Sequence, residues 1–129
     1  MKKLLLTIIF MFFMLPAQAS LKLLMAHNPA CGICQKFIKE VAVDYNDSKI
    51  AEKLPLVIIS VSEQPEWFKQ AYRENRIKVI RGTPTFIIWN GRKELGRIIG
   101  YHSKDRFYDR LLSFFPRDYL ESSLILEEQ

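Results

Sequence analysis

The two cysteines of this 129-residue chain are separated by only two residues, in Cys31-Gly32-Ile33-Cys34. A disulfide between them closes so short a loop that it constrains the unfolded chain very little, so a purely structural bridge is a weak interpretation. The chemical roles that remain are thiol–disulfide exchange and metal binding. A structural zinc site needs four ligands, and the chain's histidines, His27 and His102, stand at no recognisable ligand spacing. The motif therefore favours redox exchange.

The N-terminus has the pattern of a secretory signal. A basic start, Met1-Lys2-Lys3, is followed by an apolar run over residues 4–15, by Pro16 and by the small-residue pattern Ala17-Gln18-Ala19. This pattern predicts a signal peptide over residues 1–19 with cleavage after Ala19, and its form indicates a bacterial periplasmic destination. The apolar run is shorter than the roughly 20 residues that cross a bilayer as a helix. An uncleaved membrane anchor is the alternative.

Residues 20–116 are long enough for one domain with one core, and we interpret residues 117–129 as a C-terminal tail. The chain has 19 Lys and Arg against 14 Asp and Glu. An excess this mild and this dispersed does not predict nucleic-acid binding. The densest basic run can be a solvated helix end or a docking surface for an acidic partner; it consists of Arg73, Arg76, Lys78 and Arg81.

Apolar periodicity and turn residues predict alternating strands and helices, in the order β-α-β-α-β-β-α. The expected strands cover residues 21–26, 56–61, 85–89 and 94–101, and the expected helices cover residues 31–45, 62–75 and 103–115. Ser62 and Ser103 are the expected N-caps of the last two helices. A helical crossover makes the first two strands parallel, and Asn90-Gly91 makes the last two an antiparallel hairpin. The fold class is therefore α/β with a mixed four-stranded sheet.

The cysteine pair follows the first strand and opens the first helix, and this placement has a chemical consequence. The N–H groups of a first helical turn lack intrahelical partners, and the helix dipole favours negative charge there. We therefore expect a lowered pKa for Cys31, which makes it the attacking nucleophile. Cys34, one turn further and more buried, is the expected resolving thiol. His27 ends the first strand close by and is either a partly buried strand-end residue or a charge that tunes Cys31.

The chain resembles the thioredoxin superfamily in two blocks. One is Cys31-Gly32-Ile33-Cys34, and the other is the run 79–86 (Val-Ile-Arg-Gly-Thr-Pro-Thr-Phe), followed by Asn90-Gly91 and Gly100. The resemblance implies a three-layer thioredoxin-like fold with no cofactor and no metal. It also implies a cis peptide bond between Thr83 and Pro84, placed opposite the cysteines. A sharp turn there presents the backbone of Thr83 for pairing with a bound partner.

Three departures from the family pattern concern the surroundings of the cysteines. Ala30 replaces the usual Trp before the first cysteine, Met25 replaces a buried acid, and Ile58 replaces the lysine partner of that acid. In the family the buried acid helps proton transfer, so the resemblance implies that the changes at Met25 and Ile58 affect how Cys34 exchanges its proton. Among exported members, the short chain, the early cysteine pair and the Thr-Pro-Thr segment are most similar to small periplasmic thioredoxin-like regulators that accompany bacterial sulfur-oxidation systems.

The resemblance implies a monomeric periplasmic thiol–disulfide oxidoreductase that reduces disulfides of partner proteins. Its electrons would come from a membrane thiol-electron transporter. An oxidase or isomerase of disulfides is the alternative among enzymes. From other classes, a non-catalytic module could dock a partner through the Pro84 face, and a metal chaperone could use Cys31, Cys34 and His27. The sequence does not fix the direction of electron flow, which depends on reduction potential and partners.

Overall fold

The computed structural model describes residues 20–118, and its centre is one mixed four-stranded sheet with the strand order β2-β1-β3-β4. The strands are β1 (Lys22–His27), β2 (Leu56–Ser60), β3 (Thr85–Trp89) and β4 (Glu94–Ile99). β1 and β2 are parallel, whereas β3 is antiparallel to both β1 and β4. The predicted mixed sheet is thus confirmed, including the parallel first pair and the final hairpin.

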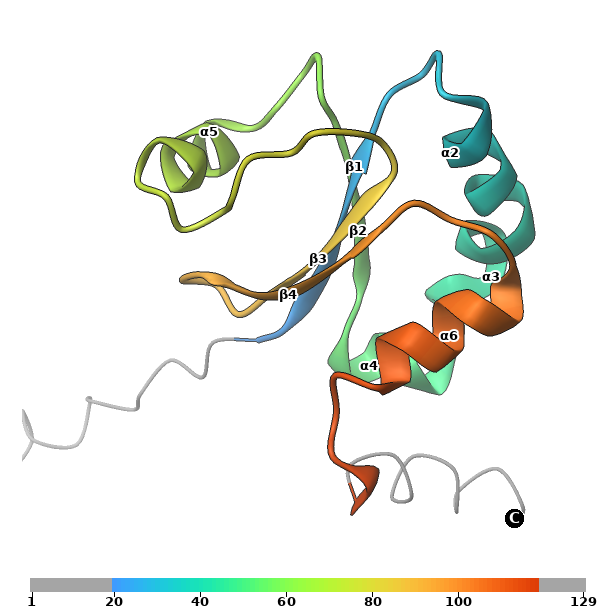
Figure 1. Ribbon diagram of the computed structural model, residues 1–129. Helices are drawn as coiled ribbons and strands as arrows, with labels where there is room; N and C mark the ends of the chain where they lie inside the picture. Colours follow the sequence, from blue (N-terminus) through green and yellow to red (C-terminus); the bar gives the residue numbers. More distant parts are fainter. Residues whose placement is uncertain (1–19, 119–129) are drawn as a thin grey trace, which may run out of the picture.

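Helices cover both faces of this sheet and produce three layers (Figure 1). The first helical run consists of α2 (Gly32–Phe37), a π-helical turn (Ile38–Ala42) and α3 (Val43–Tyr45), and the others are α4 (Lys49–Lys53), α5 (Glu66–Arg73) and α6 (Lys104–Leu112). α5 lies alone on one face, while α2, α3, α4 and α6 lie on the other. The α/β three-layer architecture predicted from the sequence is therefore present.

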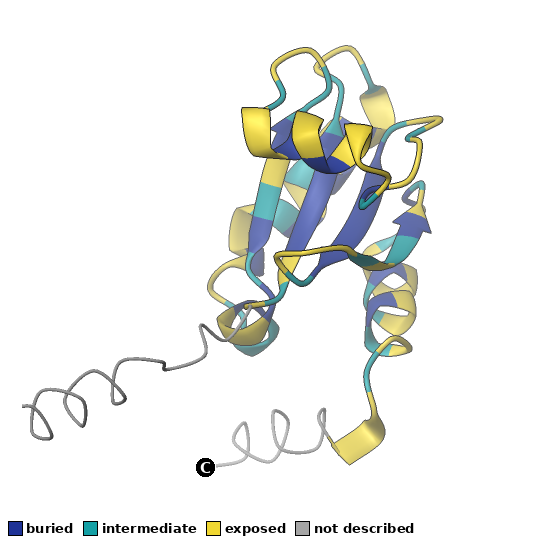
Figure 2. Cartoon of the chain, turned by 90° about the vertical axis from the view of Figure 1, so that its left-hand side faces the viewer, coloured by how far each residue is buried: buried dark blue, intermediate teal, exposed yellow. Residues whose placement is uncertain are grey.

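The central strands β1 and β3 are buried along most of their length (Figure 2), and their alternating side chains divide the core between the two faces of the sheet. Leu23 and Met25 pack with α2 and α6, whereas Leu24, between them, packs with α5. The core under α5 also contains Phe68 and Ile77. Burial of a large apolar side chain contributes about 1.5–3 kcal/mol relative to exposure, so both helical layers are held mainly by apolar contact with the sheet.

The helices differ from the prediction at several points, and α5 and α6 end earlier than expected, at Arg73 rather than residue 75 and at Leu112 rather than residue 115. Asn46-Asp47-Ser48 ends the first helical run as expected, but a further short helix, α4, follows before β2 and was not predicted. Its Ala51 is buried in the core, which is why this short segment holds helical geometry. α5 begins after Pro65 rather than after Ser62, whose hydroxyl pairs with that of Ser60 at 2.9 Å. The residue before a proline is disfavoured in the α region, so the helix starts later.

The β3–β4 hairpin turns through four residues, Asn90 to Lys93, with Gly91 at a φ of 86°. The side-chain oxygen of Asn90 accepts the backbone N–H groups of Arg92 at 2.9 Å and Lys93 at 2.8 Å. β4 ends two residues earlier than predicted because Gly100, at a φ of 79°, turns the chain away. That φ favours glycine, which has no Cβ to clash.

The predicted signal peptide, residues 1–19, lies outside the described residues, as do residues 119–129 of the predicted tail. Within residues 20–118, no helix has both the length and the apolar character that a membrane span requires.

Candidate active site

The loop between β1 and α2 fixes the position of Cys31. Asn28 anchors this loop twice, because its side-chain oxygen accepts the N–H of Ala30 at 3.0 Å and its carbonyl accepts the N–H of Cys31 at 2.9 Å. Cys31 has extended backbone angles, φ −86° and ψ 112°, and is the N-cap of α2. The sequence Asn28-Pro29 thus ends the strand and places a thiol at the start of the helix.

The sulfur of Cys31 takes the place of a capping oxygen. The backbone N–H of Cys34 donates to Cys31 Sγ at 3.2 Å, and the Cys31 thiol donates to the carbonyl oxygen of Thr83 at 3.4 Å. Thr83 is 52 residues away along the chain. The fold therefore brings together three of the residues predicted for the site, and the sulfur of Cys31 lies at their meeting point.

The two thiols have opposite pKa shifts. Partial burial raises the pKa of Cys31, but hydrogen bonds from the side chains of Cys34 and Thr83 and from backbone N–H groups of the first turn lower it more. The net pKa of Cys31 is lowered, because these donors stabilise the thiolate. Burial and the hydrogen bond to Cys31 raise the pKa of Cys34. Cys31 is thus the thiol that more readily forms the attacking thiolate, and Cys34 stays protonated.

The surroundings of Cys34 are apolar. Cys34 is 0% exposed and belongs to the same core cluster as Met25 and Phe37. Met25 pairs directly with Ile58 across β1 and β2, so two of the three positions at which the sequence departs from the family pattern are neighbours. Among residues 20–118, Thr85 is the only polar residue that is buried, so no buried Asp or Glu residue takes the place of the acid that Met25 replaces. A proton that leaves Cys34 therefore has no buried carboxylate to receive it there.

We predict that iodoacetamide at limiting concentration modifies Cys31 at least about tenfold faster than Cys34 in the reduced protein at neutral pH. Cys31 is partly exposed with a lowered pKa, whereas Cys34 is buried with a raised one. A lowered pKa keeps the thiolate populated at lower pH. As the pH is lowered, the labelling rate of Cys31 should therefore decline later than that of an unperturbed cysteine.

Peptide mass spectrometry at a series of pH values measures both rates, and the protein unfolded in urea is the control, because there the two thiols should label alike. Equal rates in the folded protein, or faster labelling of Cys34, would reverse the assignment of roles.

The segment opposite the cysteines is folded tightly around Pro84. The Thr83–Pro84 peptide bond is cis, which is the geometry predicted for it, and Pro84 is buried. The carbonyl of Pro84 accepts the N–H of Gly100 at 2.8 Å, and the Thr85 hydroxyl donates to the carbonyl of Gly82 at 2.7 Å. These bonds hold the backbone of Thr83 beside Cys31. Partner binding by Thr83 and Pro84 stays a prediction.

The histidines do not complete a metal site. Among residues 20–118, no three His, Cys, Asp or Glu side chains are grouped so that they could hold a metal ion. His102 is exposed, and its carbonyl accepts Lys36 Nζ at 2.9 Å. The Nδ1 atom of His27 is buried and has no hydrogen-bond partner within the described part of the chain. The interpretation of Cys31, Cys34 and His27 as a metal-binding set therefore finds no support.

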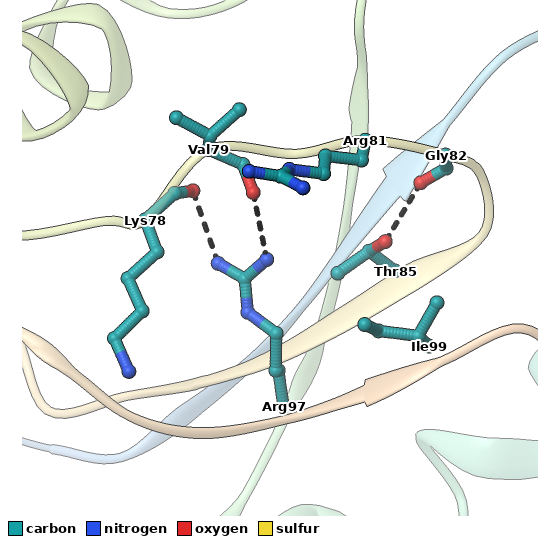
Figure 3. A pocket seen from close by; sticks show the side chains of 7 residues that line it. All are labelled: Lys78, Val79, Arg81, Gly82, Thr85, Arg97 and Ile99. Carbon is teal, nitrogen blue, oxygen red and sulfur yellow. Dashed lines mark hydrogen bonds between the residues drawn. The ribbon is translucent and has the colours of Figure 1, made fainter.

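A pocket of about 510 Å³ adjoins the Thr83 segment (Figure 3). Its lining comes from the segment before β3 and from the facing side of β3 and β4, and comprises Lys78, Val79, Arg81, Gly82, Thr85, Arg97 and Ile99. The sequence singled out Lys78 and Arg81 as part of a basic run, and Val79, Gly82 and Thr85 only as members of the family block 79–86, whereas Arg97 and Ile99 were not singled out. Arg97 and Ile99 stand two residues apart in β4, and this alternation was the available signal that they share a face.

The comparisons with known proteins agree with the geometry. The family model described as a thioredoxin-like domain matches residues 12–115. The periplasmic thioredoxin SoxS from Paracoccus pantotrophus is 25% identical, with a TM-score of 0.61 over 74% of this chain and 95% of SoxS. A thioredoxin from Thermus thermophilus is 27% identical, with a TM-score of 0.54 over 75% of this chain and 76% of that one.

Thioredoxin from Malassezia sympodialis is 18% identical and shares the fold, with a TM-score of 0.55 over 75% of this chain and 80% of that one. The curated proteins gave no match. The family match covers most of the chain, and the thioredoxin-like fold with its close Cys31–Cys34 pair supports thiol–disulfide oxidoreductase chemistry in general. The chain belongs to the thioredoxin-like family.

Proposed function

We propose that this protein is a periplasmic thiol–disulfide oxidoreductase that reduces disulfides in partner proteins. The observation that carries the proposal is the position of Cys31 Sγ, which accepts the N–H of Cys34 at 3.2 Å at the start of α2 and lies beside the carbonyl of Thr83. The signal pattern of residues 1–19 supports export, and so does the similarity to SoxS, which is described as a periplasmic thioredoxin.

The proposed reaction consists of two exchanges. The thiolate of Cys31 attacks one sulfur of the partner's disulfide, which forms a mixed disulfide, and the other sulfur leaves as a thiolate and takes up a proton. Cys34 then loses its proton and attacks Cys31 Sγ, which releases the second partner thiol. The partner gains two electrons and two protons, and the protein is left with a Cys31–Cys34 disulfide. A membrane thiol-electron transporter is the proposed source of electrons for the next cycle.

The residues between the cysteines support the reducing direction. Gly32 and Ile33 contribute no side-chain hydrogen-bond donor and no charge that would stabilise the thiolate of Cys31. Strong oxidants of this chemistry owe their potential to a highly stabilised reduced form. Because this dipeptide adds no further stabilisation of the reduced form, it favours a pair that donates electrons.

The reduction potential tests this direction. Equilibration of the protein with glutathione buffers, followed by alkylation and mass spectrometry, should give a value nearer to about −270 mV, as in thioredoxin, than to about −120 mV, as in strong periplasmic oxidants. A serine variant of Cys34 cannot form the internal disulfide and is the control for the assay. A potential near the oxidising value would favour the oxidase alternative.

A further inference from the structure

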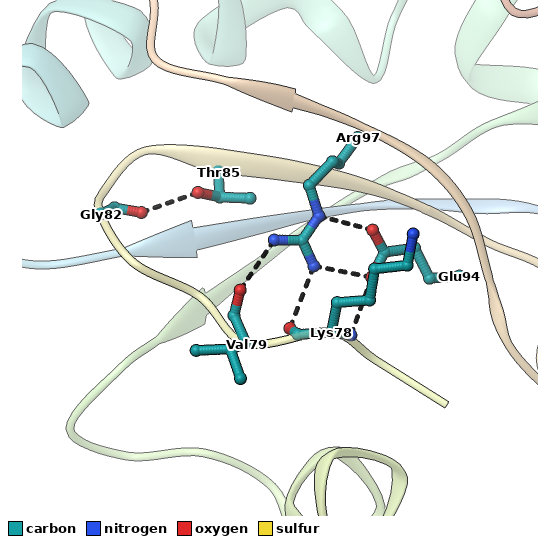
Figure 4. Close-up of polar contacts among 6 residues, drawn as sticks. All are labelled: Lys78, Val79, Gly82, Thr85, Glu94 and Arg97. Carbon is teal, nitrogen blue, oxygen red and sulfur yellow. Dashed lines mark hydrogen bonds and ion pairs between the residues drawn. The ribbon is translucent and has the colours of Figure 1, made fainter. Parts of the chain in front are cut away.

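An ion pair fixes the wall of the pocket beside Thr83 (Figure 4). Arg97 donates to the carbonyl oxygens of Val79 at 2.9 Å and Lys78 at 3.0 Å, and its guanidinium also bonds Glu94 at 2.7 Å. Glu94 in turn accepts the backbone N–H of Lys78 at 3.0 Å. The side chains of Arg97 and Glu94 are only 18% and 4% exposed. This pair ties the segment before β3 to the edge strand β4, and its charges neutralise each other.

Two cations of the pocket have no such partner. Arg81 forms no hydrogen bond or ion pair with any side chain of residues 20–118, and the ammonium of Lys78 has only a longer-range attraction to Glu94. By contrast, Arg73 pairs with Glu66 at 2.8 Å and Arg76 pairs with Glu74 at 2.6 Å. The basic run of the sequence is therefore not one surface, because half of it is neutralised on and after α5. Within this run, Lys78 and Arg81 are the two cations whose charge is available to a partner.

The pocket offers apolar surface next to these cations. Val79 is 56% exposed and Ile99 is 66% exposed, although both are large aliphatic residues. The backbone at Gly82 is accessible to a partner, because a Cβ built there would meet no atom within 4 Å. Gly82 directly precedes Thr83, whose carbonyl is 3.4 Å from Cys31 Sγ. A polypeptide whose disulfide has reached Cys31 would extend its neighbouring residues over this surface.

We propose that the pocket selects partner proteins that carry an acidic residue in the segment flanking the target disulfide. This inference rests on the proposed function and names a substrate class for it. Arg81 is the principal contact for the carboxylate, because its planar guanidinium binds carboxylates through two hydrogen bonds. Lys78 adds a second positive charge, while Val79 and Ile99 contact the aliphatic part of the segment. The Arg97–Glu94 pair is a positioning element that holds Lys78 and Val79 in place.

Two synthetic peptides test the selection. Each contains one internal disulfide, and they differ only in having Glu or Gln next to the cysteines. The second-order rate constant for oxidation of the reduced, full-length protein by each peptide is measured by acid quench and chromatography. At low ionic strength the Glu peptide should react about two- to fivefold faster, as expected for an exposed charge pair. At high salt the ratio should approach one, because screening weakens such pairs.

Three substitutions test whether Arg81 is responsible for the preference for the Glu peptide. Arg81→Gln should bring the ratio of the two rates most of the way to one, because Lys78 alone remains, and Arg81→Glu should lower the ratio further. Any change in the reactivity of Cys31 itself affects both peptides alike and cancels in the ratio. Arg92→Gln removes the same charge from the exposed tip of the β3–β4 hairpin and should leave the ratio unchanged. Circular dichroism shows whether each variant is folded.

The selection of acidic segments would be overturned if the unsubstituted protein reacted equally fast with both peptides. It would also be overturned if Arg92→Gln lowered the ratio as much as Arg81→Gln does. Disulfide reduction itself would remain intact in both cases. Failure of the unsubstituted protein to reduce either peptide would instead overturn the proposed function, and this inference with it.

Discussion

Replacement of Cys31 with serine should lower the rate of disulfide exchange by at least about three orders of magnitude. A hydroxyl at this position can still accept the N–H of Cys34, so the start of α2 should keep its cap and the fold should persist. What is lost is the nucleophile, because only the thiolate attacks a disulfide. The rate is measured by reduction of a protein disulfide with a chemical reductant that regenerates the enzyme.

The companion variant, Cys34→Ser, should fail in a different way. Cys31 can still attack, but no second thiol is present to release the partner. In periplasmic extract this variant should accumulate mixed disulfides that disappear on reduction, whereas Cys31→Ser should accumulate none. The same adducts on both variants, or none on either, would contradict the two-step exchange and favour a non-catalytic module that docks partners through the Pro84 face.

Much of the fold was predictable because its elements have local signals. The run Leu56–Ser60 is rich in β-branched residues, Asn90-Gly91 marks a hairpin, and Ser103 caps α6 by accepting the N–H of Arg106. The place of Cys31 at the start of a helix followed from the turn residues just before it. These features depend on neighbours in sequence, and so the sequence alone reveals them.

Other features arise from contacts that no local pattern records. α4 exists because Ala51 and Leu54 reach the core, and the Tyr45 hydroxyl donates to the carbonyl of Leu54 at 2.9 Å. The division of the basic run into paired and unpaired cations depends on where α5 places Glu66 and Glu74. Both features need the tertiary arrangement, which periodicity does not supply.

The candidate site shows the same division. The resemblance implied that Thr83 and Pro84 lie opposite Cys31 and Cys34, although the two blocks are far apart in the sequence. The structure adds the contact itself, in which Cys31 Sγ lies 3.4 Å from the carbonyl of Thr83. The Arg97–Glu94 pair was not predicted, because its role depends on the backbone of Lys78 and Val79, which another part of the chain brings to β4.

The second large effect is expected from Phe37→Ala, which should lower the free energy of unfolding by about 3–5 kcal/mol. Phe37 is 0% exposed, and its ring centroid lies 4.5 Å from that of Phe86, 4.9 Å from Phe107 and 5.2 Å from Tyr101. The substitution removes the ring that joins α2 to β3 and α6, and the surrounding rings can close the cavity only in part. Urea unfolding followed by circular dichroism measures the loss.

Val43→Ala is the matched control, because Val43 belongs to the same helical run and is 69% exposed. Its effect should stay within about 0.5 kcal/mol. A loss below about 1 kcal/mol for Phe37→Ala would mean that α2 is not anchored through this ring.

Phe37 also connects the stability of the fold to the geometry of the site. It lies one turn after Cys34 on α2, and its partner Phe86 lies two residues after Pro84 on β3. The contact between these two rings therefore joins the two segments that meet at Cys31 and Thr83. We expect Phe37→Ala to slow the labelling of Cys31 even at temperatures where the variant is fully folded, because the donors that lower the pKa of Cys31 are less well positioned. An unchanged labelling rate in the folded variant would show that the loop anchored by Asn28 holds Cys31 by itself.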